Sequence, residues 1–248
     1  MKKITIKTII LVPTIFAALS WAEPSVTAAE IIGRVDSVVN APKDQTMNMK
    51  LVLIDKNGNE REREIVMQQK GSDRRIGKFL APADQKGIAF LSLPEGVMYI
   101  YLPAFKKTRR IASHVKNTKF AGTDFTYEDM EASAYSEKYD AELVEQKADS
   151  YVLRLRPKKG VESEYSMLLL HVDKNNFVPT RIDHFDKAGK SCKIMTRSEV
   201  EKIDGYWFAK RSEMADLRSG QKTIMILETV RFDQGLSDDI FTERYLQR

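Results

Sequence analysis

From residue 46 onward, apolar and polar side chains alternate along most of the chain, which is typical of β-strands with one buried face. The first run ends in the turn sequence DKNGNE and carries apolar residues at Met47, Met49, Leu51 and Leu53. A two-residue turn would oppose these residues to glutamates. A three-residue loop at 56–58, with Gly58 left-handed, instead pairs Met49 with Ile65. The same register pairs Met47 with Met67. We therefore predict the longer loop and a methionine-rich, adaptable inner face.

Further strands are predicted at short intervals, separated by polar turns such as LPEG at 93–96 and DG at 204–205. Their expected ranges are residues 74–80, 88–93, 97–102, 108–113, 141–146, 151–156, 165–172, 179–186, 191–203, 206–216 and 223–232. So many strands joined by short turns indicate one meandering antiparallel sheet. A sheet of about eleven strands is large enough to curl. The predicted fold class is mainly β (α+β), with a strongly curved sheet or incomplete barrel.

One helix is predicted ahead of the strands, over residues 25–39, with Ser25 as its cap. The residues with helical spacing are Val26, Ala29, Ile32 (or Gly33), Val35 (or Asp36) and Val39. The sequence NAP at 40–42 ends this helix. We expect the helix to lie over the concave face of the sheet.

The first 22 residues have the order of a secretory signal peptide. Three lysines precede an apolar run at 9–19, and the small-residue sequence SWA follows. A retained membrane anchor is the alternative, but the apolar run is well short of the roughly 20 residues that a spanning helix needs. We therefore predict a signal peptide at residues 1–22, one domain at residues 23–248, and an exported, periplasmic protein.

The signal peptide also changes the charge argument. The full chain has 40 basic and 35 acidic residues, a net charge of +5. Without the three lysines of residues 1–22, 37 basic residues remain against 35 acidic ones. This near balance provides no global field for nucleic acid. The single cysteine, Cys192, excludes an intramolecular disulfide, so the core must supply the stability.

The stretch FAGTDFTYEDM, residues 120–130, combines aromatic and acidic residues around a glycine. Asp124, Glu128 and Asp129 have near-helical spacing and could converge on calcium, but a calcium loop places its glycine among the acids. The simpler interpretation is a short helix capped by Thr123 or Asp124, with acids in its first turn. The aromatic residues either line the mouth of the curved sheet or seal its core, and the sequence leaves both interpretations open.

Catalytic motifs are not apparent in the sequence. The three histidines, His114, His171 and His184, form no metal-binding pair, and Cys192 has no partner thiol. There is no nucleophile elbow, phosphate-binding loop or dinucleotide-binding glycine run. A pair of carboxylates could serve a glycosidase, but nothing fixes their separation. We expect a protein that is not an enzyme and uses no metal or cofactor.

The basic run at 106–110 contains Lys106, Lys107, Arg109 and Arg110. It is either a docking edge for anionic lipid head groups or an acidic partner, or a solvated hairpin.

An ordered set of motifs resembles the bacterial outer membrane lipoprotein-sorting protein family, relatives of the periplasmic lipoprotein carrier of the Lol pathway. The motifs are FLAPADQKG at 79–87, MYIYLP at 98–103, KTRRI at 107–111, FAGTDFTYEDM at 120–130 and DIFT at 239–242. The resemblance spans nearly the whole chain after residue 22. It implies a half-open antiparallel barrel closed by helices, with an apolar cavity that holds acyl chains and needs no metal or nucleotide.

The leading hypothesis is a periplasmic carrier or chaperone that shields a lipid or lipoprotein acyl chain during envelope transport and outer membrane biogenesis. The expected cavity residues are Met47, Met49, Leu51, Met67, Phe120 and Phe125, and the expected docking residues are Lys106, Lys107, Arg109 and Arg110. Implied partners are an inner-membrane transporter, an outer-membrane acceptor and a transiently contacted membrane surface. The alternative is a periplasmic sensor or accessory subunit of an envelope transporter that does not shuttle cargo.

Overall fold

Thirteen antiparallel strands form one sheet in the structure, a computed structural model that describes residues 26–248. The predicted signal peptide lies outside these residues. The strands are β1 (Asp44–Ile54), β2 (Glu60–Lys70), β3 (Arg74–Ala81), β4 (Ala89–Leu93), β5 (Val97–Leu102), β6 (Lys107–Arg110), β7 (Tyr139–Gln146), β8 (Ser150–Pro157), β9 (Met167–Asp173), β10 (Pro179–Phe185), β11 (Ser191–Ile203), β12 (Tyr206–Asp216) and β13 (Gln221–Phe232). The mainly β class is confirmed. The sheet has thirteen strands instead of about eleven because the first hairpin joins the same sheet as the later strands.

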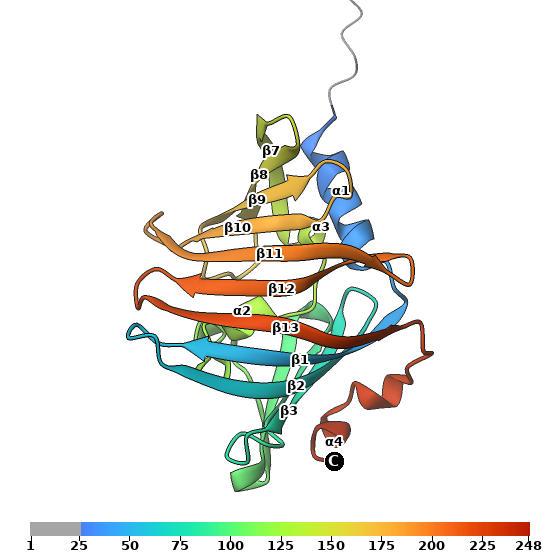
Figure 1. The fold of residues 1–248 in the computed structure, drawn as a ribbon, viewed down its shortest axis with the longest axis vertical. Helices are drawn as coiled ribbons and strands as arrows, with labels where there is room; N and C mark the ends of the chain where they lie inside the picture. Colours follow the sequence, from blue (N-terminus) through green and yellow to red (C-terminus); the bar gives the residue numbers. More distant parts are fainter. Residues whose placement is uncertain (1–25) are drawn as a thin grey trace, which may run out of the picture.

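The strand order corrects the prediction of a simple meander. From one edge to the other it is β6-β5-β4-β3-β2-β1-β13-β12-β11-β10-β9-β8-β7. The first and last strands are therefore neighbours in the middle of the sheet (Figure 1). The two edges are β6 and β7, which follow each other in the sequence. These edges are not joined by strand pairing, so the curved sheet forms a half-open barrel.

The register of the first hairpin is confirmed. Met49 lies opposite Ile65, and Met47 lies opposite Met67. The Asp55 amide donates to the Asn59 carbonyl over 3.0 Å, which leaves residues 56–58 as the loop. Gly58 has a φ of 85°, the left-handed conformation that favours glycine. All four paired residues are buried because this register keeps the glutamates of β2 away from the core.

Helix α1 (Ala28–Val39) covers part of the concave face, as predicted. Its cap is Thr27 and not Ser25, which lies outside the described residues. The Thr27 side chain accepts from the Glu30 amide, and the Glu30 carboxylate accepts from the Thr27 amide. A cap at position 25 has no such glutamate three residues later. The buried residues are Ile31, Ile32 and Val35, whereas Ala29 is exposed.

The chain between the two sheet edges, residues 111–138, crosses the concave face, and we call it the crossing segment. It contains two 3₁₀ turns, η3 (Ser113–Val115) and η4 (Phe120–Gly122), and two short helices, α2 (Tyr127–Met130) and α3 (Tyr135–Lys138). Its large buried apolar side chains belong to a core cluster with β1–β5, and its half-buried Tyr135 packs against a second cluster formed by α1 and β7–β11. Figure 1 shows α2 and α3 behind the sheet, on the side that α1 also covers.

The C-terminal residues lie on the opposite, convex face. Turn η5 (Asp238–Ile240) and helix α4 (Glu243–Leu246) follow β13, and Phe241 and Leu246 are buried against Ile76 and Leu91. Two further turns, η1 (Pro94–Gly96) and η2 (Pro103–Phe105), connect β4 to β5 and β5 to β6. Within residues 26–248, no helix is both long and apolar enough to cross a membrane.

Candidate functional site

A cavity of about 200 Å³ lies between the concave face of the sheet, the end of α1 and the crossing segment. Its lining is mostly apolar. Six of the ten methionines of the chain contribute to it: Met47, Met49, Met67, Met130, Met195 and Met225. Methionine side chains are unbranched and flexible, so they can repack around guests of different shape. The cavity therefore has a wall suited to a variable apolar ligand.

The alternation of side chains along neighbouring strands creates this wall. In the register of β1 and β13, Met49 lies opposite Leu227, and Leu51 lies opposite Met225. On β12, Ser212 lies opposite Met225. Side chains that are directly opposite each other on antiparallel strands share one face of the sheet. Apolar residues from β1, β2, β11, β12 and β13 thus meet on the same concave surface.

The six predicted cavity residues are all buried, in two different settings. The lining of the cavity includes Met47, Met49, Met67 and Phe125. Leu51 and Phe120 lie in the packed core beside the cavity and are 2% and 1% exposed. Sequence reasoning missed Met195 and Met225. The alternating pattern of β11 and β13 assigns each of these methionines to one face of its strand. Only the assembled sheet shows that this face lines the same cavity as the methionines of β1.

Phe120 anchors the crossing segment in the core. Its ring stacks on Phe79 with centroids 5.5 Å apart and meets Phe90 edge-on at 5.0 Å. Tyr127 makes a further edge-on contact at 5.6 Å. Gly77 makes room for this group, since a Cβ there would lie 2.3 Å from the Phe90 ring. The aromatic residues of the crossing segment thus seal the core beside the cavity, and Phe125 forms part of the cavity wall.

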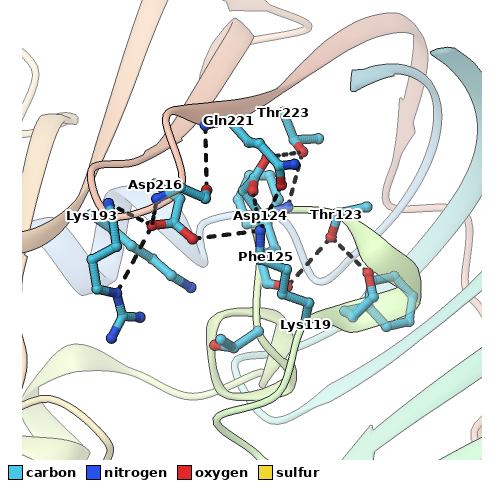
Figure 2. Close-up of polar contacts among 12 residues, drawn as sticks. Lys119, Thr123, Asp124, Phe125, Lys193, Asp216, Gln221 and Thr223 are labelled. Carbon is cyan, nitrogen blue, oxygen red and sulfur yellow. Dashed lines mark hydrogen bonds and ion pairs between the residues drawn. The ribbon is translucent and has the colours of Figure 1, made fainter. Parts of the chain in front are cut away.

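Asp124 fastens the crossing segment to β13 (Figure 2). Its amide donates to the Thr223 hydroxyl over 2.9 Å, and the same hydroxyl donates to its carboxylate over 2.8 Å. The Lys119 ammonium donates to the other oxygen of this carboxylate over 2.7 Å. The predicted caps, Thr123 and Asp124, are therefore wrong. The Asp124 carboxylate accepts from Thr223 of β13, and the Thr123 hydroxyl donates to the Phe120 carbonyl over 2.7 Å.

Thr126 caps α2 instead and leads into a buried polar network. Its side chain accepts from the Asp129 amide, and the Asp129 carboxylate accepts from the Thr126 amide. The same carboxylate accepts from Tyr165 Oη over 2.8 Å and pairs with Lys193 Nζ at 3.2 Å. Burial alone would raise the pKa of Asp129, but Lys193 and the hydrogen bonds outweigh it and lower the pKa. The network joins α2 to β11.

The three acids of this stretch point to different partners. Glu128 accepts from Ser163 Oγ over 2.5 Å and from the Glu164 amide over 2.8 Å. Asp124 contacts β13, and Asp129 contacts β11, so their carboxylates do not converge. In the part of the chain that the structure describes, no group of three potential metal ligands is found. The acids hold the crossing segment in place.

The predicted docking residues lie along an open edge of the sheet. Lys106 follows η2, and Lys107, Arg109 and Arg110 belong to the edge strand β6; all four are exposed. None of the four has a carboxylate within ion-pair distance among residues 26–248. Beside them, Phe105 is 65% exposed at the hairpin tip. Charges on an edge strand also discourage pairing with another sheet.

Solved structures with the same fold give the class of the protein. An outer membrane lipoprotein-sorting protein domain from Vibrio parahaemolyticus matches with a TM-score of 0.81 and 25% identity, over 89% of this chain and all of that one. A DUF1329 family protein from Desulfovibrio piger matches at 0.83 and 28%, over 88% and 97%. A LolA superfamily protein from Nitrosomonas europaea matches at 0.75 and 22%, over 89% and 100%, and at this identity it supports the fold alone.

These structures define the class as half-open barrels like that of the lipoprotein-sorting domain. A sequence-family profile with the description "Uncharacterized protein" matches residues 71–248. Because the match covers more than half of the chain, the protein belongs to this family. The structural neighbours of the chain itself are outer membrane lipoprotein-sorting, LolA superfamily and DUF1329 proteins. The family resemblance read from the sequence is confirmed. No curated protein is significantly similar in sequence.

Proposed function

We propose that this protein is a periplasmic carrier that shields a lipid or lipoprotein acyl chain in the methionine-lined cavity. The observation that carries the proposal is the convergence of six methionines from β1, β2, β11, β13 and α2 on one apolar cavity of about 200 Å³. A core that needed only stability would be filled by close packing, because cavities cost free energy. A cavity with flexible walls is consistent with a guest that varies.

The size of the cavity sets the scale of the interaction. At about 30 Å³ per water-sized group, it has room for roughly six such groups. Burying six methylenes contributes about 5 kcal/mol, at ~0.8 kcal/mol each, before the costs of association. A longer chain requires the methionines to repack or the crossing segment to move. The crossing segment therefore serves as the element that opens and closes the cavity in this proposal.

The periplasmic location rests on the predicted signal peptide at residues 1–22. The similarity to a lipoprotein-sorting domain supports a role between the two membranes of the envelope. The donor in this scheme is an inner-membrane transporter, and the acceptor is an outer-membrane protein. Transfer requires an acceptor that binds the acyl chain more favourably than the cavity does, because buried apolar surface otherwise keeps the chain in place.

The test is native mass spectrometry of the protein purified from a periplasmic extract without detergent, followed by solvent extraction of the bound material. We expect a discrete added mass that resolves into a lipid or an acylated peptide. A protein that is free of ligand, and that stays so after incubation with envelope lipids, contradicts the carrier function. That outcome favours the sensor or accessory-subunit alternative, which crosslinking in intact envelopes would then test.

The basic edge at Lys106, Lys107, Arg109 and Arg110 serves, in this proposal, to dock the carrier on an anionic membrane surface. The exposed Phe105 ring at the hairpin tip supplies an apolar contact beside these charges. Lys106→Gln/Lys107→Gln should reduce sedimentation with phosphatidylglycerol vesicles at low salt. The matched control is the pair Lys187→Gln/Lys190→Gln, two exposed lysines of the β10–β11 turn. Equal loss in both pairs, or none in either, contradicts docking through this edge.

A further inference from the structure

Two arginines from strands far apart in the sequence line the apolar cavity. Arg75 comes from β3 and Arg197 from β11, and both side chains contribute to its wall. Both also line an adjoining polar cavity of about 150 Å³ that continues toward α2 and α3. The two guanidinium groups therefore lie where apolar lining gives way to polar lining.

Neither guanidinium has an acidic partner. Within residues 26–248, no carboxylate lies within 4.0 Å of Arg75 or Arg197. The acids that line the adjoining polar cavity are each held by a lysine. Asp129 pairs with Lys193 at 3.2 Å, and Glu131 pairs with Lys116 at 3.0 Å. Neither guanidinium is thus in direct contact with an anion.

The hydrogen bonds of the two arginines leave donors free. Arg75 donates from Nε and Nη2 to Gln69 Oε1 over 3.0 and 2.7 Å, and from Nη1 to the Met130 carbonyl over 3.1 Å. Arg197 donates from Nη1 to the Pro179 carbonyl over 3.2 Å. A guanidinium has five N–H donors, so two remain on Arg75 and four on Arg197. Their orientation is fixed by neutral acceptors that do not cancel the charge.

Electrostatics agrees with this geometry. Burial lowers the pKa of Arg75 to about 10; the charge of Arg197 acts in the same direction, and Tyr135 and Glu131 oppose it in part. The repulsion between the two guanidinium groups is unfavourable, and an anion bound between them would reduce it. Arginine also matches the planar geometry of carboxylates and phosphates, which it binds through paired hydrogen bonds.

We propose that Arg75 and Arg197 bind the anionic head group of an amphiphile whose acyl chain occupies the methionine-lined cavity. This inference rests on the proposed function and narrows the ligand class. The guest is a lipid with a carboxylate or phosphate at the end of its chain, and a chain with an uncharged end is a poorer ligand.

The test compares laurate, dodecyl phosphate and dodecanol, which share one chain length and differ in head group. Each displaces the neutral fluorescent probe N-phenyl-1-naphthylamine from the purified protein. Charge-assisted hydrogen bonds predict that at least one anionic ligand binds about tenfold or more tightly than dodecanol. Tighter binding of laurate indicates a fatty acid as the natural source, and tighter binding of dodecyl phosphate indicates a phospholipid.

Substitutions of the two arginines test whether they cause the preference for anionic ligands. Arg197→Gln should remove most of the preference for the anionic ligand, because it weakens binding of the anionic ligand far more than binding of dodecanol. Arg75→Gln should act in the same way, but Arg197→Gln is the primary variant because it loses only one hydrogen bond. Arg231→Gln is the matched control, since Arg231 is exposed on the convex face opposite Thr46.

The outcomes separate the two proposals. Equal affinity of wild-type protein for all three ligands overturns the head-group site and leaves the carrier proposal intact. A preference that survives both Arg75→Gln and Arg197→Gln also overturns the site. Absence of probe and ligand binding in every case contradicts the proposed function itself.

Discussion

Filling the cavity from its wall is the most direct perturbation of acyl-chain binding. Ser212 on β12 is suited to this because its side chain shares the concave face with Met225, opposite it on β13, and Arg197, opposite it on β11. Ser212 also belongs to the cavity lining. Ser212→Trp places an indole in the space that the proposal assigns to the ligand. The indole enters existing space, so the cost to the free energy of unfolding should stay at or below the ~1–3 kcal/mol typical of overpacking.

The expected effect follows from the volume of the cavity. About 200 Å³ accommodates roughly six methylene-sized groups, whose burial contributes about 5 kcal/mol. Complete occlusion therefore weakens binding by roughly three orders of magnitude, at 1.4 kcal/mol per factor of ten. Because an indole fills a large part of this space, we expect the dissociation constant for a saturated acyl ligand to rise at least about a hundredfold.

The assay is displacement of a fluorescent probe by ligands of increasing chain length. In the wild-type protein, affinity should rise about fourfold per added methylene until the cavity is full. In Ser212→Trp this dependence should be nearly absent. Ser198→Trp is the matched control, because Ser198 is exposed on the convex face of the neighbouring strand β11. A folded Ser212→Trp protein that retains wild-type affinity and chain-length dependence would show that the ligand does not occupy this cavity.

Three further predictions concern the support around the cavity. Phe120→Ala removes an anchor that is 1% exposed and should lower the free energy of unfolding by about 3–5 kcal/mol in urea titrations; a loss below 1 kcal/mol would mean that the crossing segment is not cooperatively folded with the sheet. Asp129→Asn leaves the buried Lys193 unpaired and should cost about 3–5 kcal/mol at neutral pH. Lys193 and hydrogen bonds hold the pKa of Asp129 below its ordinary value of 3.8 despite burial. The stabilisation by the Asp129–Lys193 pair is therefore complete above pH 3.8 and is lost as the pH falls through the folded-state pKa. An acid unfolding transition that is the same in wild type and Asp129→Asn would contradict this pH dependence. Gly77→Ala should cost about 1–3 kcal/mol by displacing the Phe90 ring, and calorimetry that shows an unchanged melting temperature would refute the close approach.

The sequence was most informative where a wrong choice would have buried charge. The register of the first hairpin could be predicted because the shorter turn puts glutamates opposite Leu51 and Leu53. The pairing of β1 with β13 could not be predicted in this way. Strands at opposite ends of the chain share no turn, and their contact leaves no local pattern. Only that pairing brings Met225 to the same cavity as Met49.

Local capping rules also failed where tertiary contacts compete for the same side chain. Thr123, Asp124 and Thr126 are all able to cap α2, and the sequence does not rank them. The structure decides because Thr223 engages Asp124, which leaves Thr126 to pair with Asp129. In the same way, Arg75 and Arg197 look like ordinary strand residues in the sequence. The curvature of the sheet is what brings β3 and β11 to one cavity.

The neighbouring positions of β1 and β13 have a consequence for the order of assembly. A chain that emerges with its N-terminus first produces β1 early, and one side of this strand stays unpaired until β13, the last strand, has appeared. During that interval Met47, Met49 and Leu51 belong to an open edge. Sheets that depend on such distant pairings fold slowly, because the loop must close before its contacts form. The cavity is therefore completed last, so a nascent or C-terminally truncated chain lacks a finished compartment for a guest.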